Sequence, residues 1–150
     1  GAMRQGGQAG GKGLTGGDAS IIMTVVVEFH DSEVAGVELA EGALTIRFSA
    51  AWVRRADAAG GGSIGYMPDV LLRLDQPVWS GEPAVCMGRL SGGELCVGAQ
   101  QGGRVPLPFE ARGCVRMQMA FSNGAVLSAE AAAVRLAQTG EARFVESLNC

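Results

Sequence analysis

The stretch EFHDSEV, residues 28–34, concentrates side chains that could do chemistry. It holds the only histidine of the chain, His30, followed by Asp31 and Ser32, with a glutamate on each side. A histidine oriented by a carboxylate can act as a general base, and a serine within its reach can act as a nucleophile. Neighbouring residues of a strand point to opposite faces, however, so His30 and Asp31 diverge if a strand continues through them.

A structural role accounts for the same stretch more simply. Ser32 shares a face with His30 but lacks the strand–turn–helix setting of a nucleophilic serine. Asp31 and Ser32 readily accept backbone N–H groups at turns and caps. They follow the β-branched run TVVVEF, where that run must turn into the next strand. We therefore favour a structural corner over a catalytic cluster, and we predict no catalytic residue.

Metal and cofactor chemistry find little support in the distribution of ligands. His30, Asp31 and Glu33 are close in sequence, but a metal site usually draws its ligands from several elements, and no second histidine exists. The four cysteines form no C-x-x-C pair, which a structural zinc site normally shows. We expect free buried thiols at three of them and an exposed thiol at the last: Cys86, Cys96, Cys114 and Cys150. We predict no metal and no cofactor.

The composition indicates one folded domain. A chain of 150 residues with 47% apolar and 18% charged residues can bury a core. Its net charge of −3 argues against nucleic-acid binding, which needs a basic face. No apolar run approaches the ~18 residues of a membrane span, and no secretory signal is visible. We therefore expect a cytoplasmic protein without nucleic-acid or membrane partners, and leave its oligomeric state open.

Two regions of the chain differ in amino-acid composition. Residues 1–22 are rich in glycine and nearly free of large apolar side chains, so we expect a flexible tail. The first three residues, Gly-Ala-Met, are typical of what a protease leaves after an affinity tag is removed. Residues 23–150 are expected to form a single β-rich domain.

Short runs of alternating apolar residues, separated by turn signals, fill this domain. Two of these runs place every second residue on one face: Leu44, Ile46 and Phe48, and Val115, Met117, Met119 and Phe121. Hairpins are predicted at three places: Glu41-Gly42, the Ser-Gly-Gly between AVCMGRL and ELCVGAQ, and Asn123-Gly124. The run AAWVRR suggests an edge or a short helical turn, and residues 56–69 suggest a loop. A bulge or break is expected at residues 130–132, and EARFVESL closes the set. About eight to ten short strands and little helix predict an all-β fold, as a single antiparallel β-sandwich or flattened barrel.

A partner-binding surface is one use of the exposed side chains, and solubility of an edge strand is the other. Trp52 is followed closely by Arg54 and Arg55, a composition found at the centres of protein interfaces. The other aromatic residues, Trp79 and Tyr66, are far apart in sequence. Candidate contact residues are chosen for type and expected exposure in or beside the glycine-rich loop: Arg54, Arg55, Asp57, Tyr66 and Asp69.

Two longer segments resemble a known group of proteins. FHDSEV followed by VELAEGALTIRF is similar to the opening of bacterial immunity-type proteins, and the later run MAFSNGAVLSAEAAAVRLAQTGEARFVESL looks like the closing half of such domains. The resemblance implies a cytoplasmic antitoxin that binds and neutralises a cognate bacterial toxin domain, delivered by secretion or contact. It implies a structural role for the His-Asp segment and carries over no toxin-binding residue.

The leading hypothesis is therefore a non-enzymatic immunity protein that occludes the active site of its toxin. Two alternatives remain at this point. One is a small enzyme that uses His30 with a neighbouring carboxylate, Asp31 or Glu33. The other is a β-sandwich that binds a small ligand between its sheets.

Overall fold

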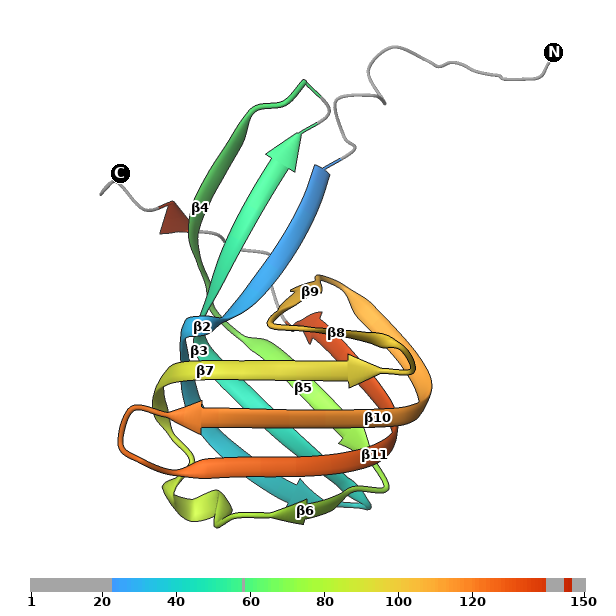
Figure 1. The fold of residues 1–150 in the computed structure, drawn as a ribbon. Coiled ribbons are helices and arrows are strands. Elements are labelled where there is room, and N and C mark those ends of the chain that lie inside the picture. The colour runs from blue at the N-terminus through green and yellow to red at the C-terminus, as the bar shows by residue number, and fades with distance from the viewer. Residues whose placement is uncertain (1–22, 58, 140–144, 147–150) are drawn as a thin grey trace, which may run out of the picture.

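The computed structural model describes residues 23–57, 59–139 and 145–146, and in them the chain is almost entirely β-strand. Eleven strands form one sheet, and the one helical element described is the short 3-10 turn η1 (Pro83–Val85). Six strands, all paired antiparallel, close into a barrel (Figure 1). Around the barrel they are β2 (Met23–Ala40), β3 (Ala43–Asp57), β5 (Val70–Asp75), β11 (Val126–Gln138), β10 (Phe109–Phe121) and β7 (Gly88–Val97). The all-β prediction is confirmed, and the chain adopts the barrel alternative.

β2 and β3 form a long hairpin, of which only the half next to its turn belongs to the barrel. Its turn is Glu41-Gly42, as predicted, and both residues have positive φ (54° and 74°), which suits a two-residue hairpin turn. The first half of β3 pairs with β5, and its second half pairs with β4 (Gly62–Met67). Similarly, β2 pairs with β7 beyond its middle but with β9 (Arg104–Pro106) near its start.

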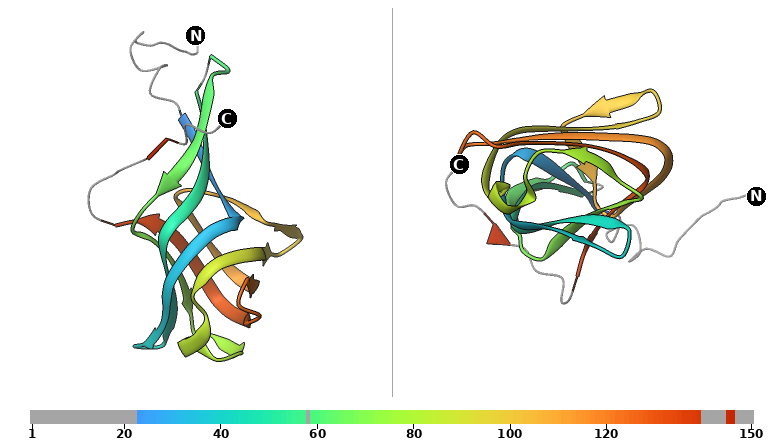
Figure 2. Two further views of the ribbon diagram at one scale, coloured as in Figure 1. Left: turned by 90° about the vertical axis from the view of Figure 1, so that its left-hand side faces the viewer. Right: turned by 90° about the horizontal axis from the view of Figure 1, so that it is seen from below.

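The outer part of this hairpin extends the sheet away from the barrel. We call this extension the arm; it comprises residues 23–28 of β2, residues 51–57 of β3, and the strands β4, β9 and β12 (Val145–Glu146). Figures 1 and 2 show β4 and the outer halves of β2 and β3 standing clear of the barrel. Two further short strands lie on the barrel: β6 (Val78–Ser80) pairs with β11, and β8 (Gln100–Gly102) pairs with β7.

Alternating side chains fill the barrel interior. The predicted alternations of β3 and β10 are confirmed, because each of the following is buried: Leu44, Ile46, Phe48, Val115, Met117, Met119 and Phe121. Phe29 of β2 stacks on Phe48 of β3, with ring centroids 6.4 Å apart. The core is therefore made of packed side chains, as is usual for a small barrel.

The predicted hairpin at Ser91-Gly92-Gly93 is wrong, since β7 runs straight through these residues. Gly93 lies against the buried ring of Phe29: a Cβ at Gly93 would be 2.9 Å from the Cβ of Phe29. The glycine thus serves close packing between strands, and its turn-forming capacity is not used.

Two predictions around the arm are also wrong. AAWVRR, expected at an edge or in a helical turn, lies in the middle of β3, where β2 and β4 pair on either side. Of the loop expected at residues 56–69, residues 62–67 form β4. Gly62 suits this strand, because a Cβ there would be 2.7 Å from the carbonyl oxygen of Arg55. The close approach of the β3 backbone explains why glycine occupies this position, although glycine is otherwise unfavourable inside a strand.

The hairpin at Asn123-Gly124 is confirmed and joins β10 to β11. The break expected at residues 130–132 is wrong, because β11 is continuous from Val126 to Gln138. The irregularity lies on the partner strand instead: β10 changes register between Arg112 and Val115, where Gly113 and Cys114 both have positive φ. Of the closing segment EARFVESL, only Val145 and Glu146 fall in the described residues, and they pair with β4.

Candidate functional site: the arm face and the bend beside it

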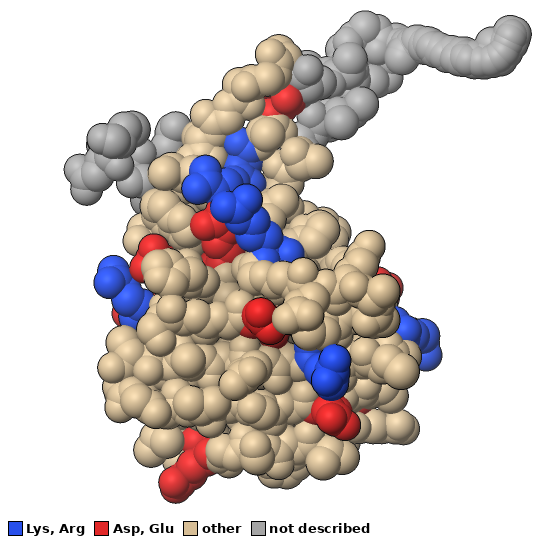
Figure 3. All heavy atoms as spheres, in the orientation of Figure 1, with Lys and Arg blue, Asp and Glu red and all other residues tan. Residues whose placement is uncertain are grey.

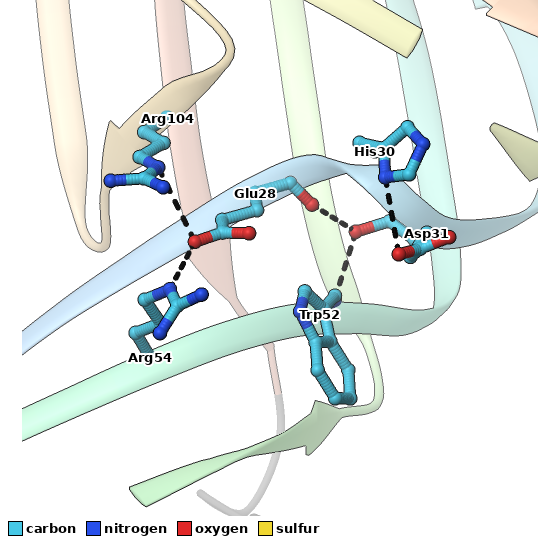
Figure 4. Close-up of polar contacts among 7 residues, drawn as sticks. Glu28, His30, Asp31, Trp52, Arg54 and Arg104 are labelled. Carbon is cyan, nitrogen blue, oxygen red and sulfur yellow. Dashed lines mark hydrogen bonds and ion pairs between the residues drawn. The ribbon is translucent and has the colours of Figure 1, made fainter. Parts of the chain in front are cut away.

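The His30 segment forms a bend inside β2. Glu28 pairs with Trp52 and Glu33 with Ala50, so residues 29–32 bulge out of the ladder. The bend is held by Ser32, which is fully buried. Its hydroxyl donates to the carbonyl oxygen of Glu28 at 2.6 Å and accepts from the backbone N–H of Trp52 at 2.8 Å (Figure 4). The segment is therefore a structural corner, although it bends one strand and does not connect two.

His30 and Asp31 meet in this bend, contrary to the divergence expected of an unbroken strand. Asp31 has a φ of 74°, and the His30 Nδ1 lies 3.1 Å from the Asp31 Oδ2. Both side chains are exposed to solvent, at 66% and 43%. The serine beside them offers no nucleophile, since its hydroxyl is buried and engaged by backbone groups on both sides.

Five side chains meet on one surface of the arm, which we call the arm face: Glu28, Trp52, Arg54, Tyr66 and Arg104. The strand register places Trp52 between Glu28 on β2 and Tyr66 on β4, and it places Arg104 on β9 beside Glu28. Arg54 is two residues beyond Trp52 on β3, hence on the same side. The rings of Trp52 and Tyr66 pack with centroids 4.7 Å apart and planes inclined at 58°.

Glu28 joins two arginines at the centre of the arm face. The Nε of Arg54 and the Nε of Arg104, 3.3 Å away, both contact the same oxygen, Glu28 Oε2 (Figure 4). The carboxylate side chain is only 14% exposed, whereas the arginine side chains are 52% and 69% exposed. These three residues carry a net charge of +1, on a chain whose net charge is −3. Figure 3 shows blue Lys and Arg atoms gathered over the base of the arm.

The structure brings together only two of the five predicted contact residues. Arg54 and Tyr66 lie on the arm face, whereas Arg55 is on the opposite side of β3, next to Arg54 in sequence. Asp57 stabilises the tight β3–β4 connection: its Oδ1 accepts from the backbone N–H groups of Ala59 and Gly61. Asp69 lies in the turn between β4 and β5 with a φ of 60°.

Two residues of the arm face were missed by the sequence analysis. Glu28 was noted only as a flank of the histidine, and Arg104 was not considered. Neither has a local signal, because Arg104 reaches Glu28 only through the pairing of β9 with β2. A cation opposite a glutamate is visible only once the register is known.

The cysteines differ from one another in environment. Cys86 is buried, as predicted, and its thiol donates to the carbonyl oxygen of Glu82 at 3.2 Å. Burial, together with the nearby carboxylate of Glu82, raises the pKa of this thiol. The other two thiols expected to be buried are not: Cys96 is only half-buried, and Cys114 is exposed because it lies in the bulge of β10. Cys150 lies outside the described residues.

An exposed apolar region lies away from the arm, around β6 and the segment after it. Its residues are among the large apolar side chains most exposed in the described chain: Val78, Trp79, Val85, Met87 and Val126. Trp79 is here, so the structure separates it from Trp52 and Tyr66. The side-chain amide of Asn123, in the β10–β11 turn, donates to the carbonyl oxygen of Val85 and fixes this segment.

Within the described residues, no group of three His, Cys, Asp or Glu side chains could hold a metal ion. The same part of the chain contains no helix that is long and apolar enough to span a bilayer. In comparisons with protein-family models, curated proteins and solved structures, none matches this chain.

Proposed function

We propose that this protein is a non-enzymatic binding protein whose arm face docks on a partner protein. The observation that carries the proposal is the packing of Trp52 and Tyr66 beside the Arg54–Glu28–Arg104 cluster. Tryptophan, tyrosine and arginine are the residues that most often dominate binding energy at protein interfaces. They lie here at the base of the arm, whose outer strands β2, β3 and β4 stand clear of the barrel (Figure 1).

The side chains of the arm face are also positioned by contacts within this chain. Trp52 is flanked by the paired strands β2 and β4, and its backbone N–H is held by Ser32. Both guanidinium groups are oriented by one mostly buried carboxylate. Side chains that are already ordered lose less conformational entropy on binding, which favours affinity.

We propose further that the partner is a bacterial toxin domain, which this protein neutralises by covering the active site. This assignment rests on the resemblance of FHDSEV and VELAEGALTIRF to the opening of immunity-type proteins. The structural role of Ser32 in the bend of β2 is consistent with that segment acting as a fold signature.

The enzyme alternative has weaker support. His30 and Asp31 form a pair 3.1 Å apart, but the adjacent Ser32 hydroxyl is buried and occupied. The pair therefore lacks the positioned nucleophile that a catalytic triad requires. The His30→Ala variant should retain the binding of a partner and the fold.

The test is co-expression of the tagged protein with the product of the adjacent gene in its source bacterium. The proposal predicts a stoichiometric complex and loss of that product's toxicity. Trp52→Ala should weaken the complex, because aromatic anchors at interface centres typically contribute ~2 kcal/mol or more, about a thirtyfold change in Kd. Trp79→Ala, which truncates the exposed tryptophan of β6, is the matched control and should leave the affinity unchanged. A complex weakened by Trp79→Ala and not by Trp52→Ala would refute docking through the arm face.

A further inference from the structure

The two arginines of the arm face are held in a way that leaves most of their donors unused. Each contacts Glu28 through its Nε, and both reach the same oxygen. The Nη groups of Arg54 and Arg104 make no hydrogen bond or ion pair to the rest of the described chain. A guanidinium group carries five N–H donors in a planar fork that matches the geometry of an oxyanion.

An open hollow of about 540 Å³ adjoins Arg104 at the base of the arm. Its lining includes the polar side chains of Glu28, His30 and Arg104. Its other lining residues include four glycines, Gly92, Gly93, Gly102 and Gly103, which leave the backbone uncovered. The lining also includes Gln101, whose side-chain amide donates to Glu94 at 3.0 Å. An incoming anion would contact Arg104, the arginine of this lining.

Charge favours a negatively charged group at this position. The shared carboxylate neutralises only one of the two guanidinium groups, and it also fixes their orientation. Fixed donors of this kind bind carboxylates with charge-assisted hydrogen bonds. The neighbouring Trp52–Tyr66 pair extends the same surface with apolar area.

We propose that Arg54 and Arg104 form a subsite for an acidic side chain, Asp or Glu, of the partner protein. This inference rests on the proposed function, because it names the chemistry that the arm face recognises. The carboxylate contacts the unused Nη groups of the two arginines, beside the hollow that Arg104 lines, and the aromatic pair contacts the residues that flank it.

The direct test follows the Nε–Hε signals of the arginines by NMR while the full chain is titrated with acetyl-tetraglutamate amide. The expected result is saturable shifts at Arg54 and Arg104 that are absent with acetyl-tetraglutamine amide. Arg54→Gln and Arg104→Gln should each raise the Kd of the tetraglutamate peptide by roughly tenfold, because each removes one charge-assisted hydrogen bond. Arg73→Gln is the matched control, since Arg73 is 53% exposed and pairs with Asp75 on the barrel.

Several outcomes would overturn the subsite. Absent shifts, or equal weakening by Arg73→Gln, would show that the two arginines have no special affinity for carboxylates. Inorganic phosphate binding at least as tightly as the peptide would assign the pair to another anion. These failures are separable from failure of the proposed function. If Trp52→Ala weakens the partner complex while Arg54→Gln and Arg104→Gln do not, the arm face still docks and only the acidic subsite is wrong.

Discussion

Replacing Ser32 by alanine should destabilise the protein through the bend of β2. The hydroxyl of Ser32 satisfies two backbone groups that the interrupted ladder leaves unpaired, at 2.6 Å and 2.8 Å. Leaving a buried donor or acceptor without its partner costs about 1–3 kcal/mol. Both groups are only partly buried, so we take the lower part of that range for each and expect a loss of roughly 2–3 kcal/mol in the free energy of unfolding.

Urea denaturation measures this loss. With a slope of about 1–3 kcal/mol per molar in urea, the midpoint of unfolding should fall by roughly 0.7–3 M at an unchanged slope. Ser91→Ala is the matched control, since its hydroxyl donates to the carbonyl oxygen of Ala120 at an exposed position. It should change the stability by less than about 0.5 kcal/mol. If the two variants unfold at the same urea concentration, Ser32 does not hold the bend.

Two further predictions concern the barrel. Gly93→Ala should cost about 1–3 kcal/mol in thermal or chemical unfolding, because its Cβ would meet Phe29 at 2.9 Å, whereas Gly92→Ala has open space and should be nearly neutral; equal effects would contradict the packing argument. Alkylation followed by mass spectrometry should find Cys114 modified well before Cys86, whose pKa is raised by burial. Because the pKa of Cys86 is raised in the folded protein, this thiol ionises at a lower pH in the unfolded chain than in the folded one. Stability should therefore fall from the ordinary thiol pKa up to the raised one, and Cys86→Ala should flatten this fall.

The sequence predicts the fold class well because its signals are local. Alternation along residues 44–48 and 115–121, and the turns at Glu41-Gly42 and Asn123-Gly124, depend on neighbouring residues alone. Glycine was the main source of error. Gly62 and Gly93 were interpreted as loop or turn residues, but each is small because another strand approaches closely, which no local pattern reveals.

The arm face was predictable only in part for the same reason. Trp52 and Arg54 stood out by type, and Tyr66 was chosen for its expected exposure. Their meeting with Glu28 and Arg104 depends on two strand pairings, β3 with β4 and β2 with β9. The bulge at residues 29–32 also changes which side chains share a face, so His30 and Asp31, which would diverge in a regular strand, meet there.

Docking through the arm face is tested most directly by hydrogen–deuterium exchange of the complex with the co-purified partner. The account predicts slower amide exchange on binding in peptides covering residues 24–28, 52–57 and 62–67, with little change in residues 78–87. Protection confined to residues 78–87, the exposed apolar region around β6, with the arm unchanged, would contradict it.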